Sequence, residues 1–293
     1  MKPAPFAYVD PSSVPETLDL LAEYGDQAKL LAGGQSLVPL MNFRLARMSV
    51  LIDLNCVADL AKLSEEGDGL LRLGAMVRQR TLERFAATRP QWSLLCRALS
   101  LVGHGAIRTR GTLGGSLAHA DPAAELPAIL LCHDGAVVAR RRGGERTIPA
   151  AELFQGPLTT ALEPDELLEE VRLPALPADA GWGFEEVARR HGDFALVGVA
   201  AVLASDSAGR VRDARLVLFG VGDTPIRASA AERALMGRAA TDDQAITEAA
   251  RVAADALDPP TDLQATSAYR RRVARVLSER ALAAAAARAG GAP

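Results

Sequence analysis

The stretch Leu30-Leu31-Ala32-Gly33-Gly34-Gln35-Ser36-Leu37 runs from apolar residues into two glycines, a polar pair and a further apolar segment. This pattern predicts a strand at 29–32 that turns into a helix at 36–44. Glycine permits a positive φ and lets backbone amides approach a ligand without an intervening Cβ. Successive amides at such a turn form a concavity suited to a pyrophosphate. Because Gly-Gly pairs usually mark plain turns, this stretch alone leaves both interpretations open.

A second glycine-rich passage, Gly111-Thr112-Leu113-Gly114-Gly115-Ser116, repeats the double glycine and adds flanking hydroxyl groups. Two such loops can hold one pyrophosphate from both sides through their main-chain amides. Asp121 and Glu125 follow, four residues apart, and could accept hydrogen bonds from hydroxyl or ring donors of the ligand. Asp121 would equally serve as the N-cap of a helix that begins at Pro122, so its interpretation stays open.

Composition and missing motifs exclude several classes of function. A net charge of −3 over 293 residues gives no electrostatic reason to expect nucleic acid as a partner. We expect no membrane span, because no apolar segment is long enough. The cysteines and histidines show no metal-site spacing, and isolated thiols fit a reducing cytoplasm. Since no strand precedes a Gly-x-Gly-x-x-Gly, and neither a P-loop nor a Gly-x-Ser-x-Gly motif occurs, we predict no Rossmann or P-loop fold, no metal and no catalytic nucleophile.

The pattern of predicted elements changes near a proline-rich stretch at 174–181. Short strands and helices alternate before it. Beyond it, three consecutive strands are expected at 184–188, 194–204 and 210–220, followed by helices near 229–236, 242–256 and 266–288. Strands followed by helices are typical of an α+β domain. We therefore expect a domain boundary between residues 176 and 177.

The two glycine loops, together with Pro39-Leu40-Met41, Asp121-Pro122 and Arg189-Arg190-His191-Gly192-Asp193-Phe194-Ala195, give the chain a specific resemblance. It resembles the FAD subunit of the xanthine dehydrogenase and carbon monoxide dehydrogenase family over nearly its whole length. The resemblance implies an α+β fold. An FAD-binding domain of the vanillyl-alcohol oxidase (PCMH) type would occupy 1–176, in lobes of about 1–55 and 56–176. A smaller domain of the CO dehydrogenase flavoprotein type, with a three-stranded antiparallel sheet and a helix bundle, would occupy 177–293.

The same resemblance implies where FAD binds. Its pyrophosphate would lie between the two glycine loops. Leu168 matches a position that packs on the flavin ring, Phe194 one beside the reactive edge of the ring, and Glu125 a carboxylate that contacts the cofactor in some relatives. Arg189, as a fixed cation, would favour reduced, anionic flavin. The implied cofactor-binding residues are Leu31, Ala32, Gly33, Gly34, Gln35, Ser36, Leu37, Thr112, Gly114, Gly115, Ser116, Asp121, Glu125, Leu168, Arg189 and Phe194.

The resemblance also implies a role in electron transfer. A large molybdopterin-binding subunit would hydroxylate the substrate, and a small subunit would carry two [2Fe–2S] clusters. This chain would collect the electrons on FAD and pass them to an acceptor, in a dimer of heterotrimers. We therefore expect no catalytic acid or base here. Two alternatives stay open: a self-contained flavin oxidoreductase of the same fold, and an assembly subunit that has lost its flavin.

Overall fold

The computed structural model describes residues 2–67 and 69–289, and their contacts group into two compact units. Unit 1 contains the chain up to Arg84 together with His104–Ala120 and Asp134–Pro174. Unit 2 contains Phe85–Gly103, Asp121–His133 and the chain from Ala175 onward. Mixed helix and strand content confirms the α+β class. In the described parts of the chain, no helix is both long and apolar enough to cross a membrane.

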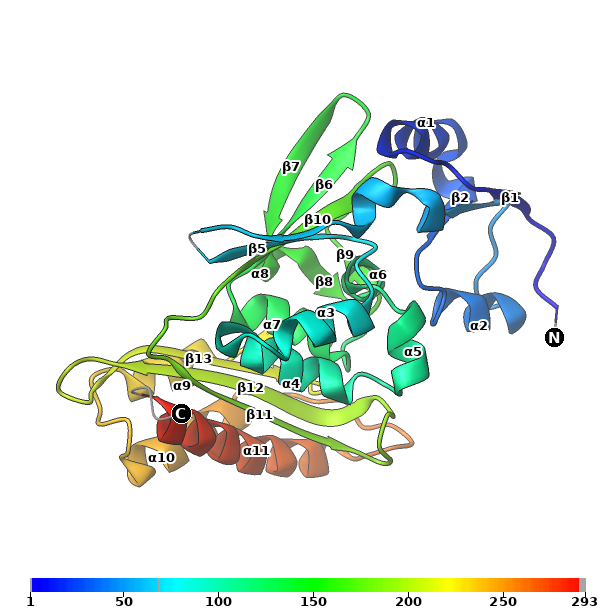
Figure 1. Ribbon diagram of the computed structural model, residues 1–293. Helices are drawn as coiled ribbons and strands as arrows, with labels where there is room; N and C mark the ends of the chain where they lie inside the picture. Colours follow the sequence, from blue (N-terminus) through cyan, green and yellow to red (C-terminus); the bar gives the residue numbers. More distant parts are fainter. Residues whose placement is uncertain (1, 68, 290–293) are drawn as a thin grey trace. The chain divides into compact units, whose positions relative to one another are not determined.

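Unit 1 begins with a small parallel sheet whose strand order is β1-β3-β2 (Figure 1). The strands are β1 (Ala7–Val9), β2 (Ala28–Leu31) and β3 (Val50–Asp53). Helix α1 (Val14–Tyr24) joins β1 to β2, as crossover connections between parallel strands require. Ser13 caps α1 by accepting a hydrogen bond from the Glu16 amide, and Gly25, at φ +49°, ends it. A buried apolar cluster that includes Val14, Leu18, Leu21 and Ile52 fixes α1 on the sheet.

The rest of unit 1 is built around an antiparallel sheet of order β4-β5-β10-β6-β7. Its strands are β4 (Leu63–Glu65), β5 (Leu70–Gly74), β6 (Ala136–Arg141), β7 (Gly144–Pro149) and β10 (Leu167–Pro174). Short helices accompany it, namely α2 (Leu37–Asn42), α3 (Gln79–Ala86), α5 (Gly105–Arg110), α6 (Leu113–His119) and α8 (Ala150–Leu153). The strands β8 (Phe154–Gly156) and β9 (Thr159–Thr160) form a separate hairpin. Short 3-10 helices lie at Gly25–Gln27, Leu54–Cys56 and Ala58–Ala61 in unit 1 and at Pro90–Trp92 in unit 2.

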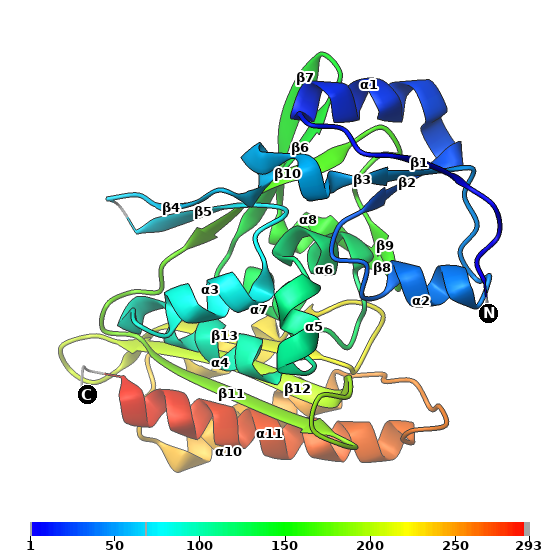
Figure 2. The same ribbon diagram turned by 45° about the vertical axis from the view of Figure 1, so that its right-hand side comes forward.

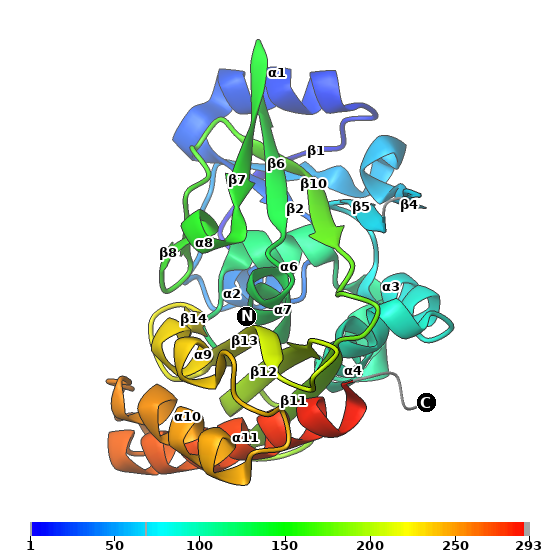
Figure 3. The ribbon, with the colours of Figure 1, turned by 90° about the vertical axis from the view of Figure 1, so that its left-hand side faces the viewer.

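Unit 2 is a sheet of order β11-β12-β13-β14 with helices on both faces (Figure 3). The three expected strands are β11 (Gly181–Ala188), β12 (Ala195–Ser205) and β13 (Val211–Phe219), and the short β14 (Ile226–Arg227) adds a fourth. One face carries the expected helices α9 (Ser229–Leu235), α10 (Asp243–Asp255) and α11 (Ser267–Arg288). The other face carries α4 (Ser93–Leu101) and α7 (Glu125–Cys132), which come from earlier in the chain. Because both faces are covered, β12 is buried along nearly its whole length.

Glycines set the distance between α11 and the sheet. A Cβ at Gly181 would collide with the carbonyl of Ala285, and one at Gly183 would collide with the carbonyl of Ala281. Ala274, Ala281 and Ala285 are themselves completely buried. The alanine-rich sequence of α11 therefore serves close packing, since small side chains let helix and sheet backbones approach.

One carboxyl group in unit 2 is buried on the α4 side of the sheet. The Oε2 atom of Glu186, on β11, has no hydrogen-bond partner among the described residues. Burial raises the pKa of Glu186 to about 7, although the charge of Arg97 on α4 partly opposes the shift. The folded protein therefore favours the protonated carboxyl.

This burial predicts a pH-dependent stability. The unfolded carboxyl titrates near 4.5 and the folded one near 7, so its stabilising contribution is complete below about 4.5 and lost as the pH rises through 7. Glu186→Gln should stabilise the protein at pH 8 by roughly 1–2 kcal/mol and change little at pH 4.5. Denaturant unfolding of both proteins at the two pH values measures this. An identical stability difference at both values would contradict the assignment.

Candidate functional site

The first glycine loop, residues 32–36, connects β2 to α2 in unit 1. Gly34 has φ +72°, a conformation that favours glycine, and the Gln35 side chain donates to the Gly33 carbonyl oxygen over 3.1 Å. The amides of residues 33 to 36 donate to no acceptor within residues 2–67 and 69–289. Four successive amides are thus available to a ligand. This is the concavity that the sequence predicts.

The second loop differs, because the amides of residues 113 to 116 already donate to acceptors within the protein. Thr112 is the N-cap of α6 and accepts from the Gly115 amide over 3.0 Å. The amides of Leu113 and Gly114 donate to the carbonyls of Val77 (3.0 Å) and Ala75 (2.9 Å), and Ser116 donates back to the Thr112 carbonyl. The prediction of ligand-facing amides in both loops therefore needs correction here, since these amides hold the loop and helix in place. Sequence reasoning also missed α6 itself, because two glycines inside a helix lower its propensity.

The structure brings the two loops together. A Cβ on Gly33 would lie 2.8 Å from the Gly111 Cα and closer still to the Arg110 carbonyl oxygen. A Cβ on Gly115 would lie 3.2 Å from the Ala32 Cβ. Figure 2 shows α2 and α6, which follow the two loops, near one another in unit 1. Glycine at these positions therefore serves the contact between loops as well as access for a ligand.

Two residues that the sequence analysis did not single out bond to both loops. Arg78 donates to the Arg110 carbonyl and to the Asn55 side chain, and Asn55 donates to the Ala32 carbonyl over 3.1 Å. No local pattern marks Arg78, because arginine is frequent in this chain. Asn55 lies two residues beyond Asp53, the last residue of β3, and that place near the end of a parallel strand was the available signal.

Of Leu168 and the acidic pair beyond the second loop, Leu168 and Glu125 are buried and Asp121 is half-buried. Leu168, on β10 in unit 1, is buried. Asp121 accepts a hydrogen bond from the Ala123 amide in an Asx turn. The alternative of a helix that begins at Pro122 is wrong, because α7 begins only at Glu125. The turn carries the chain past the proline before the helix starts, and leaves Glu125 buried in its first turn.

The remaining predicted residues belong to unit 2, as do Asp121 and Glu125. The guanidinium of Arg189 donates to the Gln264 side-chain oxygen over 2.9 Å. Phe194, just before β12, is 59% exposed, which is unusual for a large aromatic side chain. The structure thus unites the two loops within unit 1 and presents Phe194 and Arg189 on the loop between β11 and β12.

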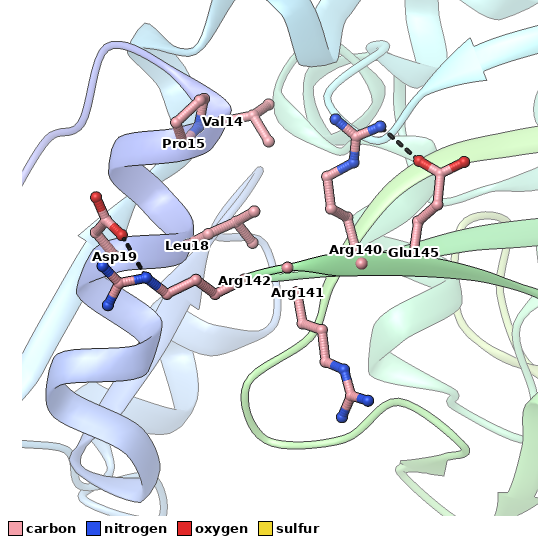
Figure 4. A pocket seen from close by; sticks show the side chains of 10 residues that line it. Val14, Pro15, Leu18, Asp19, Arg140, Arg141, Arg142 and Glu145 are labelled. Atoms are coloured by element: carbon pink, nitrogen blue, oxygen red, sulfur yellow. Dashed lines mark hydrogen bonds and ion pairs between the residues drawn. The ribbon is translucent and has the colours of Figure 1, made fainter.

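A hollow of 420 Å³ in unit 1 lies apart from the predicted residues (Figure 4). It is lined by α1 and the β6–β7 hairpin, and two of its three arginines are paired: Arg142 with Asp19 at 3.3 Å, and Arg140 with Glu145 at 2.5 Å. None of the predicted cofactor residues lines it. Among residues 2–67 and 69–289, no group of three or more metal-ligating side chains gathers.

Comparison with known proteins identifies the family. The model described as the FAD binding domain in molybdopterin dehydrogenase matches residues 4–176, and the CO dehydrogenase flavoprotein C-terminal domain matches residues 182–285. The chain belongs to this family of FAD-binding dehydrogenase subunits. Its cofactor is FAD, and it is an oxidoreductase subunit. The resemblance noted in the sequence is confirmed.

Similar proteins match over almost their full length. The 6-hydroxypseudooxynicotine dehydrogenase complex subunit alpha of Paenarthrobacter nicotinovorans is 43% identical over 97% of this chain and 95% of its own. The caffeine dehydrogenase subunit beta of Pseudomonas sp. (strain CBB1) is 40% identical over 98% and 96%. A chain of the solved carbon monoxide dehydrogenase from Hydrogenophaga pseudoflava, in a form lacking the Mo-pyranopterin moiety, superimposes with a TM-score of 0.94 at 39% identity, covering 99% of this chain and 100% of that chain.

The loop contact predicts that even the smallest side chain at Gly33 disrupts FAD binding. Gly33→Ala should weaken FAD affinity at least about a hundredfold, or about 3 kcal/mol, because the new methyl group must push the Arg110-Gly111 backbone away. Titration of the deflavinated full-length chain with FAD measures this. Gly144→Ala is the matched control, since a Cβ there meets open space and its affinity should equal that of wild type. Equal affinities for all three proteins would refute the loop assignment.

Proposed function

We propose that this chain is the electron-transfer subunit of a heteromeric molybdenum hydroxylase. A large molybdopterin-binding subunit would act on the substrate, and a small subunit with two [2Fe–2S] clusters would deliver the electrons. This chain would pass them from its FAD to an external acceptor, within a dimer of heterotrimers. Relatives named subunit alpha, subunit beta and medium chain support membership of a complex. FAD supplies the electron-accepting chemistry, and the protein binds the cofactor and orients it.

The observation that carries this proposal is that the amides of residues 33 to 36 have no acceptor among the described residues. They lie beside a second loop whose own amides donate to the backbone carbonyls of Ala75 and Val77. Such amides stabilise a pyrophosphate by hydrogen bonding and by their aligned dipoles. Arg78 and Arg110 add positive charge at the same place. The residues present therefore fit the diphosphate of FAD. We place it against the first loop, with the Thr112 and Ser116 hydroxyls as further donors.

Further contacts with the cofactor follow from the family resemblance. We propose that Leu168 packs on the flavin ring, and that Phe194 lies at the ring's reactive edge, which its exposure permits. Asp121 and Glu125 would accept hydrogen bonds from FAD, and Arg189 would stabilise the reduced anion. The functional division would be an FAD-binding domain of residues 1–176, with lobes of about 1–55 and 56–176, and a C-terminal domain of residues 177–293.

Absorption spectroscopy tests the proposal. After incubation with FAD and removal of excess cofactor, the full chain should show flavin absorption bands at one FAD per chain. Coexpressed with a cluster-bearing and a molybdopterin-bearing partner, its FAD should bleach when substrate is added, and only when the cluster subunit is present. A colourless chain after reconstitution would eliminate flavin binding. Bleaching of the isolated chain by an organic substrate would instead favour the self-contained oxidoreductase.

A further inference from the structure

One guanidinium group connects the two glycine loops. Arg78 Nη1 donates a hydrogen bond to the carbonyl oxygen of Arg110, at the start of the second loop. Arg78 Nη2 donates one to the side-chain oxygen of Asn55. The side-chain nitrogen of Asn55 then donates to the carbonyl oxygen of Ala32, at the start of the first loop, over 3.1 Å. The chain of contacts runs from one loop to the other through two side chains. All four residues lie in unit 1.

The second loop is hydrogen-bonded to the backbone on either side of Arg78. The Gln79 amide donates to the Gly111 carbonyl over 2.9 Å, and the Leu113 amide donates to the Val77 carbonyl over 3.0 Å. Arg78 therefore forms a β-bridge with Thr112. These backbone hydrogen bonds hold the second loop in place. The Arg78 side chain is not needed for that and can act on the position of the first loop.

Asn55 is held in the orientation that this connection needs. Its side-chain nitrogen also donates to Asp53 Oδ1, which accepts the Asn55 backbone amide over 2.9 Å. Asp53 Oδ2 in turn accepts the Tyr8 hydroxyl over 2.6 Å, and this bond raises the pKa of Tyr8 to about 12. The Asn55 amide group thus presents its oxygen to Arg78 and its nitrogen to the first loop.

The charge of Arg110 lies close enough to Arg78 to disfavour the protonated form of the Arg78 guanidinium. Burial, followed by the charge of Arg110, lowers the pKa of the Arg78 guanidinium, and Asp53 only partly compensates. Arg78 has no carboxylate hydrogen-bond partner among the described residues. An anion placed against the first loop would relieve this repulsion.

We propose that Arg78 and Asn55 are positioning residues, a clasp that holds the first glycine loop against the second at the spacing FAD requires. This inference rests on the proposed placement of the FAD diphosphate against the first loop, beside the second. Among the residues that the structure describes, the hydrogen bonds between the first loop and Arg78 pass through Asn55, so the clasp works in series. Charge alone is insufficient: a lysine ammonium lacks the planar fork that reaches both acceptors at once.

FAD titration of the deflavinated full-length chain tests the clasp. Arg78→Lys and Asn55→Ala should each weaken FAD binding about tenfold to a hundredfold. The double variant should be little worse than the weaker single variant, since both changes break the same connection. Amide hydrogen exchange at residues 33 to 36 should quicken in both single variants without FAD, whereas their melting temperatures should stay near that of wild type. Arg80→Lys is the control and should bind FAD normally, because Arg80 lies in α3, pairs with Glu83 over 2.8 Å and keeps its charge as lysine.

The outcomes separate the clasp from the site. Wild-type affinity in Arg78→Lys would overturn the clasp and leave only a role for charge. Fully multiplicative losses in the double variant would overturn the series connection. If Gly33→Ala loses FAD while both clasp variants keep it, the loops bind FAD but the clasp is wrong. If all three variants bind FAD like wild type, the proposed placement of FAD itself is wrong.

Discussion

The close approach of the Gly33 backbone to the Arg110-Gly111 backbone governs the arrangement of unit 1. These two segments lie far apart in the sequence, and any side chain at Gly33 would overlap the opposite main chain. The parallel sheet β1-β3-β2 brings the first loop to this point at the end of β2, and the segment that follows β5 brings the second. Where two backbones meet this closely, their polar groups must be satisfied by each other, by side chains or by a ligand.

The two loops satisfy that requirement in different ways. In the second loop, the amides of residues 113 to 116 are hydrogen-bonded within the protein, so the loop is held in one position. In the first loop, the carbonyls of Ala32 and Gly33 are bonded by side chains, while the amides of residues 33 to 36 are not. A site with one rigid side and one unsatisfied side is preorganised for an anion, because the donors need not first be released from other partners. This difference is the physical basis for placing the diphosphate against the first loop.

Glycine has a different function in unit 2. Gly181 and Gly183 admit the backbone of α11 to the sheet, and Gly198 makes room for the ring of Phe219. No ligand is needed to explain these positions, because each is filled by the protein itself. The contrast shows that a glycine is informative about binding only when its surroundings are known. Removing a Cβ serves helix packing and cofactor access equally well.

The sequence alone predicted the family, the FAD cofactor, the α+β class and the principal elements of both parts of the chain. The family and the cofactor followed from the resemblance that the paired glycine motifs carry. The principal elements followed from strand and helix periodicity, which is a local signal that few residues specify. The sequence overestimated the second loop, since it could not show that α6 uses those amides. One of the two interpretations that it left open for Asp121, a helix that begins at Pro122, is wrong. Only the tertiary structure decided which amides stay available and which side chains, Asn55 and Arg78, join the loops. Hydrogen bonds between segments far apart in the chain depend on their placement in space, and no local pattern of residues encodes that placement.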